Sequence, residues 1–227
     1  MIRSILFSIT FWPFFILYIT VMYPVAFFSK PQTVLYSVYR PVTRWLLFCL
    51  KNFAGIDYKI LNLSKIPAAP IIVGCNHQST WETFVFSLLF DKLAIVIKKE
   101  LLQIPIAGLY FKRLGCIPID RASPVSAIKT LLRFGKEAYQ KRNNILIFPN
   151  GTRGGVDEQI EYKSGIFALY KTLGIPVIPV KINSGKFWPR RSFRKIPGSI
   201  TLDFKEPISA GLTKEEFFTK FEREMNE

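Results

Sequence analysis

The sequence predicts an α/β fold, in which a mixed, partly parallel sheet is flanked by helices and preceded by a separate helical segment. From about Asp57 onward, short apolar runs alternate with helical patterns, and such alternation is typical of layered α/β domains. The chain has 227 residues and is 49% hydrophobic, which is enough for the core of one domain. A third observation is an uncharged stretch at the N-terminus, which sets that end apart.

This uncharged stretch covers 26 positions, residues 4–29, between Arg3 and Lys30. A helix of that length measures about 39 Å and could cross a hydrocarbon core of about 30 Å. Pro13 and Pro24 interrupt it, so one straight rod is not expected. The stretch therefore either spans a membrane once or forms a shallow hairpin in it.

The next stretch, residues 33–53, has the pattern of an amphipathic helix. Arg40, Arg44 and Lys51 fall within an arc of about 40° on a mostly apolar surface. Such a stripe suits an interface with anionic lipids, although a charged stripe on a core-packed helix would look the same.

The charge asymmetry of the N-terminal part predicts its side of the membrane. Residues 1–81 hold seven Lys+Arg against Asp57 alone, which puts the rest of the chain on the cytoplasmic face of the membrane. In a bacterial source this membrane would be the inner membrane. We expect residues 1–55 to anchor the protein and residues 56–227 to form the α/β domain.

Within the α/β domain the apolar runs and helical patterns predict seven strands and five helices. The strands are expected at 58–61, 70–75, 92–97, 115–119, 144–148, 176–182 and 199–204. The helices are expected at 79–90, 103–113, 123–142, 163–173 and 213–226.

The composition excludes several classes of protein. Three scattered cysteines do not make a disulfide framework. A single histidine excludes a histidine-rich metal site, and no metal is expected. The net charge is +15. In so apolar a chain this charge points to an anionic membrane surface or a phosphorylated substrate before nucleic acid.

The lone histidine, His77, follows a predicted buried strand and precedes a predicted helix. The carboxyl ends of strands are where open α/β sheets place ligand-handling groups. Glu82 lies in the first turn of the helix, from which its carboxylate could reach the ring of His77. The spacing Ser79-x-x-Glu82 equally fits a capping box, and the spacing alone does not decide between the two.

A His–Glu pair would supply a general base. Neutral imidazole accepts protons near physiological pH, and a carboxylate on its other nitrogen fixes the tautomer. No G-x-S-x-G elbow supports a hydrolase triad. Cys75 could in principle be a nucleophile, but a buried strand cysteine is the favoured interpretation.

Three further strands end in basic, turn-rich segments. They hold Lys98 and Lys99, then Asp120 and Arg121, and finally the run 148–153. Each places a cation at a strand terminus, where several could converge on one phosphate.

These segments together resemble the 1-acyl-sn-glycerol-3-phosphate acyltransferases over residues 70–207. The family block N-H-x4-D is matched from Asn76-His77 to Glu82, and a second block runs from Gly115 to Asp120-Arg121. The block F-P-E-G-T-R is matched by Phe148-Pro149-Asn150-Gly151-Thr152-Arg153, followed by Lys163-Ser164-Gly165 and by a fourth block that contains Pro179.

The resemblance implies a glycerolipid acyltransferase-like fold and a set of roles. His77 would deprotonate the sn-2 hydroxyl of lysophosphatidate, with Glu82 orienting it, and the alkoxide would attack acyl-CoA or acyl-carrier protein directly. No cofactor is implied beyond that co-substrate. Glycerol-phosphate binding is implied for Lys98, Lys99, Arg121, Asn150, Gly151, Thr152 and Arg153. Supporting positions are Asn76, Gly115, Asp120, Lys163 and Pro179.

Two departures from the family pattern leave alternatives open. Glu82 stands where the family has aspartate, and Asn150 stands where it has glutamate, so a charge is lost there. The acceptor could be another lysolipid or glycerol 3-phosphate, or the protein could be an inactive lipid-binding homologue. The basic, aromatic segment 181–195 could bind nucleic acid, but no RNA-binding signature accompanies it, and no nucleic-acid partner is expected.

Overall fold

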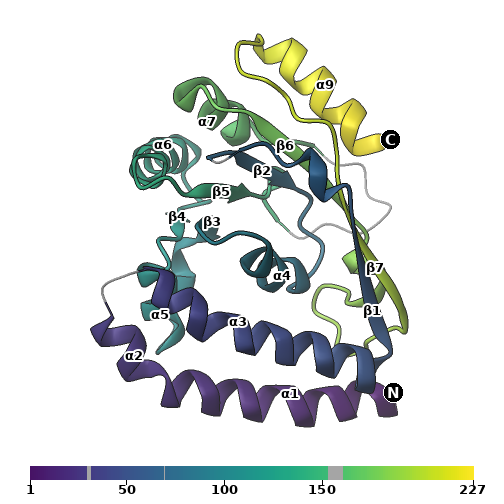
Figure 1. Cartoon of the computed structure of the whole chain (residues 1–227). Coiled ribbons are helices and arrows are strands. Elements are labelled where there is room, and N and C mark those ends of the chain that lie inside the picture. The colour runs from purple at the N-terminus through teal and green to yellow at the C-terminus, as the bar shows by residue number, and fades with distance from the viewer. Residues whose placement is uncertain (30–31, 69, 153–160) are drawn as a thin grey trace.

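The computed structural model describes residues 1–29, 32–68, 70–152 and 161–227, and in this part of the chain one seven-stranded sheet forms the centre (Figure 1). Its order is β1-β7-β6-β2-β5-β3-β4. Neighbouring strands are parallel except β6 and β7, which are antiparallel. The strands are β1 (Ile56–Leu61), β2 (Ile72–Cys75), β3 (Leu93–Lys98), β4 (Ile117–Ile119), β5 (Asn144–Ile147), β6 (Val177–Ile182) and β7 (Gly198–Phe204). The mixed sheet is confirmed.

Helices cover both faces of the sheet. Figure 1 shows α6 (Pro124–Gln140), α7 (Gly165–Leu173) and α9 (Lys214–Asn226) on one face. The other face carries α4 (Trp81–Leu89) and α5 (Ala107–Arg113), with the N-terminal helices beyond them. Each face has its own buried apolar cluster.

The central strand β2 shows why the two faces pack as they do. Ile72 belongs to the cluster under α6, α7 and α9, whereas Val73 and Cys75 face the other cluster, as the period-two geometry of a strand requires. A Cβ atom on Gly74 would lie 2.7 Å from Ile166 and 2.8 Å from Phe221. Glycine therefore lets α7 and α9 approach the strand closely.

The N-terminal segment forms a helical hairpin that lies along the domain (Figure 1). Its helices are α1 (Ile2–Val21), α2 (Tyr23–Phe28) and α3 (Gln32–Cys49), the last continued by a π-helical segment, Leu50–Ala54. Pro13 lies inside α1, and Pro24 opens α2.

Helix α1 is attached to the domain along its length by one face. Phe7 and Phe11 are fully buried. The hydroxyl of Ser4 accepts Lys195 N at 2.9 Å near one end of α1, and Ile19 O accepts the Tyr110 hydroxyl at 2.9 Å near the other. The opposite face exposes Ile9, Leu17 and other apolar residues. Among the described helices, α1 is the one long and apolar enough to cross a membrane.

Two features of the α-helices differ from the sequence prediction, and the 3-10 helices Leu63–Lys65 and Lys99–Gln103 were not expected. The helix expected at 103–113 begins only at Ala107, because Pro105 interrupts it and Ile106 adopts φ 64° in a γ-turn closed by Ala107 N donating to Pro105 O at 2.7 Å. The short helix α8 (Ser184–Phe187) was not expected. The seven strands lie within two residues of their predicted ends.

Candidate active site

Polar side chains meet at the carboxyl edge of the parallel strands. His77 follows β2, Asn150 follows β5, and Ser184 follows β6. Because β2 pairs in parallel with β5 on one side and with β6 on the other, the carboxyl ends of the three strands lie at one edge of the sheet and bring the following turns together. This is the place where an α/β sheet holds its ligands.

Glu82 connects the histidine to two of these turns. Its Oε1 atom lies 2.9 Å from His77 Nδ1 and accepts the backbone N–H groups of Gln78 and Ser79 at 2.7 Å each. Its Oε2 atom accepts the hydroxyl of Ser184 at 2.9 Å. The carboxylate is fully buried, so four donors offset the cost of burying its charge. Glu82 both caps the turn and contacts the imidazole, as its spacing allows.

The ring of His77 is fixed in orientation and tautomer. A carboxylate accepts hydrogen bonds, so Nδ1 carries the ring proton and Nε2 carries the basic lone pair. The ring stacks on Phe148, with centroids 4.2 Å apart and planes at 23°. The side chain is 12% exposed, which gives a substrate access to the imidazole.

Asn150 holds the backbone of His77 from the neighbouring strand. Its Oδ1 atom accepts His77 N at 3.1 Å, and its Nδ2 atom donates to His77 O at 3.2 Å. An amide makes both bonds, whereas a carboxylate could make only the first. Asn150, which departs from the family pattern, thus fits the backbone of the segment after β2 that carries His77, the histidine turn.

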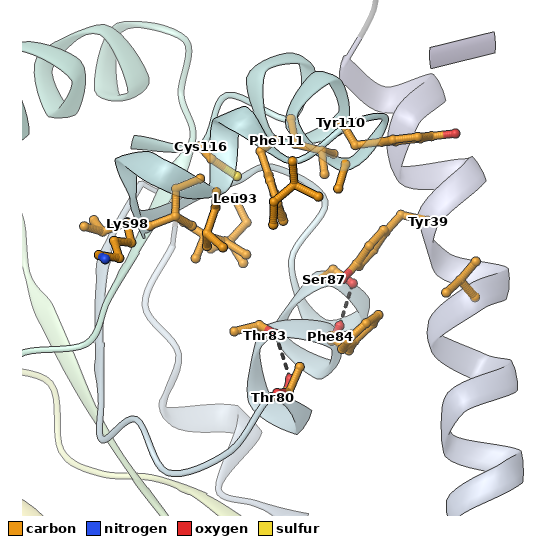
Figure 2. A pocket seen from close by; sticks show the side chains of 18 of the residues that line it. Tyr39, Thr80, Thr83, Phe84, Ser87, Leu93, Lys98, Tyr110, Phe111 and Cys116 are labelled. Carbon is orange, nitrogen blue, oxygen red and sulfur yellow. Dashed lines mark hydrogen bonds between the residues drawn. The ribbon is translucent and has the colours of Figure 1, made fainter. Parts of the chain in front are cut away.

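A cavity of about 660 Å³ opens at this edge. Its polar end is lined by His77, Lys98, Arg121, Thr152, Arg190 and Arg191. Figure 2 shows the apolar remainder, where Tyr39, Phe84, Leu93, Phe111 and Cys116 surround the space between α3, α4 and α5. A polar mouth with a long apolar interior suits an amphiphilic ligand.

Some predicted site residues lie near this mouth without lining it. Lys99 forms an ion pair with Asp120, and the hydrogen bond from Lys99 lowers the pKa of the Asp120 carboxyl. Asn76 is buried beside His77. Gly151 adopts φ 70° in the turn after β5, and its N–H donates to Phe148 O at 2.9 Å.

Three others have structural surroundings. Gly115 adopts φ 71° where α5 ends, Lys163 pairs with Glu161 at 3.0 Å, and Pro179 lies within β6 opposite Gly74. Lys99, Asp120 and these three are absent from the described residues that line the cavity. The expected ligand Arg153 lies outside the described residues.

Three residues of the site are not marked by any motif in the sequence. Ser184 follows a predicted strand, and Arg190 and Arg191 belong to the basic segment 181–195. Ser184 could have been found from its position directly after a predicted strand. The two arginines reach the cavity through the path of a loop, which no sequence pattern reports.

Cys75 has the surroundings of a structural residue. It is fully buried, and its thiol donates to Asn76 O at 3.4 Å. Burial, and secondarily the charge of Glu82, raise the pKa of this thiol well above its ordinary value. The thiolate needed for nucleophilic attack is therefore disfavoured.

Comparison with known proteins finds acyltransferases. The family profile described as Acyltransferase matches residues 57–183. The chain is 38% identical over 179 residues to a 1-acyl-sn-glycerol-3-phosphate acyltransferase of Pseudomonas aeruginosa, covering 77% of this chain and 70% of that protein. It is 28% identical over 183 residues to a protein of the same name from Cocos nucifera, covering 79% of this chain and 58% of that protein.

A solved structure shares the fold. The crystal structure of the 1-acyl-sn-glycerophosphate (LPA) acyltransferase PlsC from Thermotoga maritima matches with a TM-score of 0.69, at 22% identity, over 98% of this chain and 94% of that one.

Proposed function

Because the chain belongs to the acyltransferase family, we propose that it transfers a fatty acyl group from a thioester to the sn-2 hydroxyl of lysophosphatidate and so forms phosphatidate. One observation carries the proposal. His77, held by Glu82 at 2.9 Å, faces a cavity with a cationic mouth and an apolar interior. These are the groups that an amphiphilic phosphate acceptor and a fatty acyl chain require.

His77 acts as the general base in the proposed reaction. Its Nε2 atom takes the proton of the sn-2 hydroxyl while that oxygen attacks the thioester carbonyl. The new C–O bond forms, the C–S bond breaks, and the imidazolium returns its proton to the leaving thiolate. Glu82 stabilises the imidazolium through Nδ1. No acyl-enzyme is formed, since Cys75 is buried and protonated.

The acceptor phosphate is bound by cations and by the turn after β5. Lys98, Arg121 and Thr152 line the mouth, and Gly151 shapes the turn that carries Thr152. Arg153 follows directly in the sequence and is assigned the same ligand. Lys99, whose ammonium group is paired with the carboxylate of Asp120, is assigned the same phosphate. Asn150 holds the backbone of His77 and so positions the imidazole toward the acceptor.

The acyl chain lies in the apolar part of the cavity, and the N-terminal helices hold its opening at a membrane. Exposed apolar residues along α1, such as Ile2, Ile9 and Leu17, favour a helix lying in the membrane interface rather than crossing it, because the other face of α1 packs on the domain. We assign residues 1–55 to this anchoring part and residues 56–227 to the catalytic domain. Since residues 1–81 have a net charge of +6, the cytoplasmic leaflet is the proposed location.

The test is acyl transfer by the purified full chain with a panel of acceptors and both donor types, the product being identified by mass. Lysophosphatidate should give phosphatidate with acyl-CoA or acyl-carrier protein at the highest kcat/KM. A higher kcat/KM with glycerol 3-phosphate or another lysolipid would reassign the acceptor. No transfer to any acceptor would contradict the proposal.

A further inference from the structure

The proposed reaction brings two phosphate-bearing molecules to one site. Lysophosphatidate carries a phosphate monoester close to its reacting hydroxyl. Acyl-CoA and acyl-carrier protein share a different feature, a phosphopantetheine arm. Its phosphate continues as a diphosphate in acyl-CoA and as a phosphodiester to a serine in acyl-carrier protein. The donor phosphate is separated from the thioester by the length of that arm. Its site must therefore be distinct from the acceptor's and lie farther from His77.

The sheet order supplies two cationic sides around His77. From β2, which ends just before His77, strands β5, β3 and β4 extend to one side, where Lys98 and Arg121 line the mouth. Strand β6 is the neighbour of β2 on the other side. The segment after β6 and α8 carries Arg190 and Arg191, which line the same cavity.

The segment that carries these arginines has a fixed shape. Ile196 N donates to Phe187 O at 2.9 Å and closes its base. Lys195 is buried, with Nζ 4.7 Å from the ring centroid of Trp188 and its backbone N donating to Ser4 Oγ at 2.9 Å. Side chains held on such a frame lose less entropy when they bind a ligand.

Charge distinguishes the two sides as well. Residues 181–200 contain six Lys+Arg and no Asp or Glu. On the side of β5, β3 and β4, by contrast, the charge of Lys98 is partly offset by Glu100, whose Oε1 atom lies 3.2 Å from Lys98 Nζ. Arginine is also the side chain best shaped to grip two oxygens of one phosphate.

We propose that Arg190 and Arg191 bind the phosphate of the phosphopantetheine arm of the thioester donor. The proposal rests on the function given above, and it assigns the acceptor phosphate to the opposite side of His77. It applies equally to acyl-CoA and to acyl-carrier protein, because the two share this phosphate.

The test compares two thioesters that differ only in this group, palmitoyl-phosphopantetheine and palmitoyl-pantetheine, with lysophosphatidate as acceptor. The variant is Arg190→Gln with Arg191→Gln, which keeps much of each side-chain stem. Arg194→Gln is the matched control, because Arg194 is exposed on the same segment and is not among the described residues lining the cavity. Circular dichroism and thermal unfolding show whether each variant is folded.

The double variant should raise KM for the phosphorylated thioester by about tenfold or more, as expected for the loss of charge-assisted hydrogen bonds. KM for palmitoyl-pantetheine and for lysophosphatidate should stay at the wild-type values, and Arg194→Gln should change none of the three. The same rise is expected with acyl-CoA and with acyl-carrier protein.

Three results would overturn the assignment. They are an unchanged KM for the phosphorylated thioester, an equal rise for both thioesters, and a rise in KM for lysophosphatidate instead. Weaker binding to anionic vesicles with unchanged KM values would give these arginines to the membrane and also overturn it. Wild-type protein that forms no phosphatidate from any thioester would refute the proposed function itself.

Discussion

At the scale of single residues, the arrangement around His77 fixes the histidine from three directions. Glu82 accepts from Nδ1, Phe148 stacks on the ring, and Asn150 bonds both backbone groups. Ser184 in turn donates to Glu82. Preorganisation of this kind lets an imidazole act as a base without rearranging during the reaction.

Asn150→Asp tests the backbone contact. Aspartate keeps the acceptor for His77 N but loses the donor to His77 O, an effect worth about 1–3 kcal/mol. We expect kcat to fall by about tenfold or more, with the KM values of both substrates nearly unchanged. A protonated aspartic acid regains a donor, so the ratio of variant to wild-type kcat should rise as the pH falls.

Asn52→Asp is the matched control for this substitution, because the Asn52 amide also donates to a backbone carbonyl, Phe48 O at 2.8 Å, outside the active site. It should leave kcat unchanged. A rise in KM for lysophosphatidate with unchanged kcat in Asn150→Asp would assign Asn150 to the headgroup and not to His77.

At the scale of elements, α4 connects the histidine turn to the depth of the cavity. Thr80, Thr83, Phe84 and Ser87 line the cavity from one face of this helix, as residues three and four apart do. The Thr83 hydroxyl donates to Thr80 O at 2.7 Å and the Ser87 hydroxyl to Phe84 O at 2.6 Å (Figure 2). The rise from Thr80 to Ser87 is about 10 Å. Because the Thr83 and Ser87 hydroxyls bond to the backbone of α4 itself, these short side chains stay close to the helix and leave space in the cavity for an acyl chain.

Ser87→Leu should shorten the acyl chains that the protein accepts. Leucine is a good helix former, and its side chain would fill space about 10 Å along α4 from the histidine turn. We expect kcat/KM with long-chain acyl thioesters to fall and that with short-chain ones to be kept, as measured over a series of chain lengths. Thr83→Val, which has nearly the same shape, is the control. An unchanged chain-length profile for Ser87→Leu would place the acyl chain elsewhere.

The exposed face of α1 makes a second prediction at this scale. Ile9 and Ile16 are 60% and 59% exposed, so replacing both by aspartate should not disturb the core. Each loses about 1.5–3 kcal/mol of apolar burial in a membrane, and binding to anionic vesicles in a flotation assay should fall by about tenfold or more.

The matched control has leucine at both positions and should bind as wild type does. Activity on detergent-dispersed substrate should be kept by both variants. Full vesicle binding by the aspartate variant would move the anchoring surface to another part of the protein.

The elements also show what the sequence could and could not predict. Strands such as β2 and β6 were predictable because a continuous apolar run is bounded by turn residues. The start of α5 was not, since Ile106 is held in a γ-turn by its surroundings. The contact of Ser184 with Glu82 was not predictable either, because it depends on β2 and β6 being neighbours in the sheet.

At the scale of the whole molecule, the cavity is formed by parts far apart in the sequence. The sheet edge supplies the histidine and the cations, whereas α1, α3, α4 and α5 enclose the apolar space. The N-terminal hairpin is thus part of the cavity wall as well as the proposed anchor. Tyr110 of α5 donates to Ile19 O of α1 at 2.9 Å, which connects the two sides of that wall.

The central claim, that His77 is the base of a direct acyl transfer, is tested most directly by His77→Ala assayed for phosphatidate formation from lysophosphatidate and acyl-CoA. The substitution should lower kcat by about 10²–10⁴-fold, the usual contribution of a positioned general base, while thermal unfolding and vesicle binding remain close to wild type. A folded His77→Ala variant that forms phosphatidate at the wild-type rate would contradict the account.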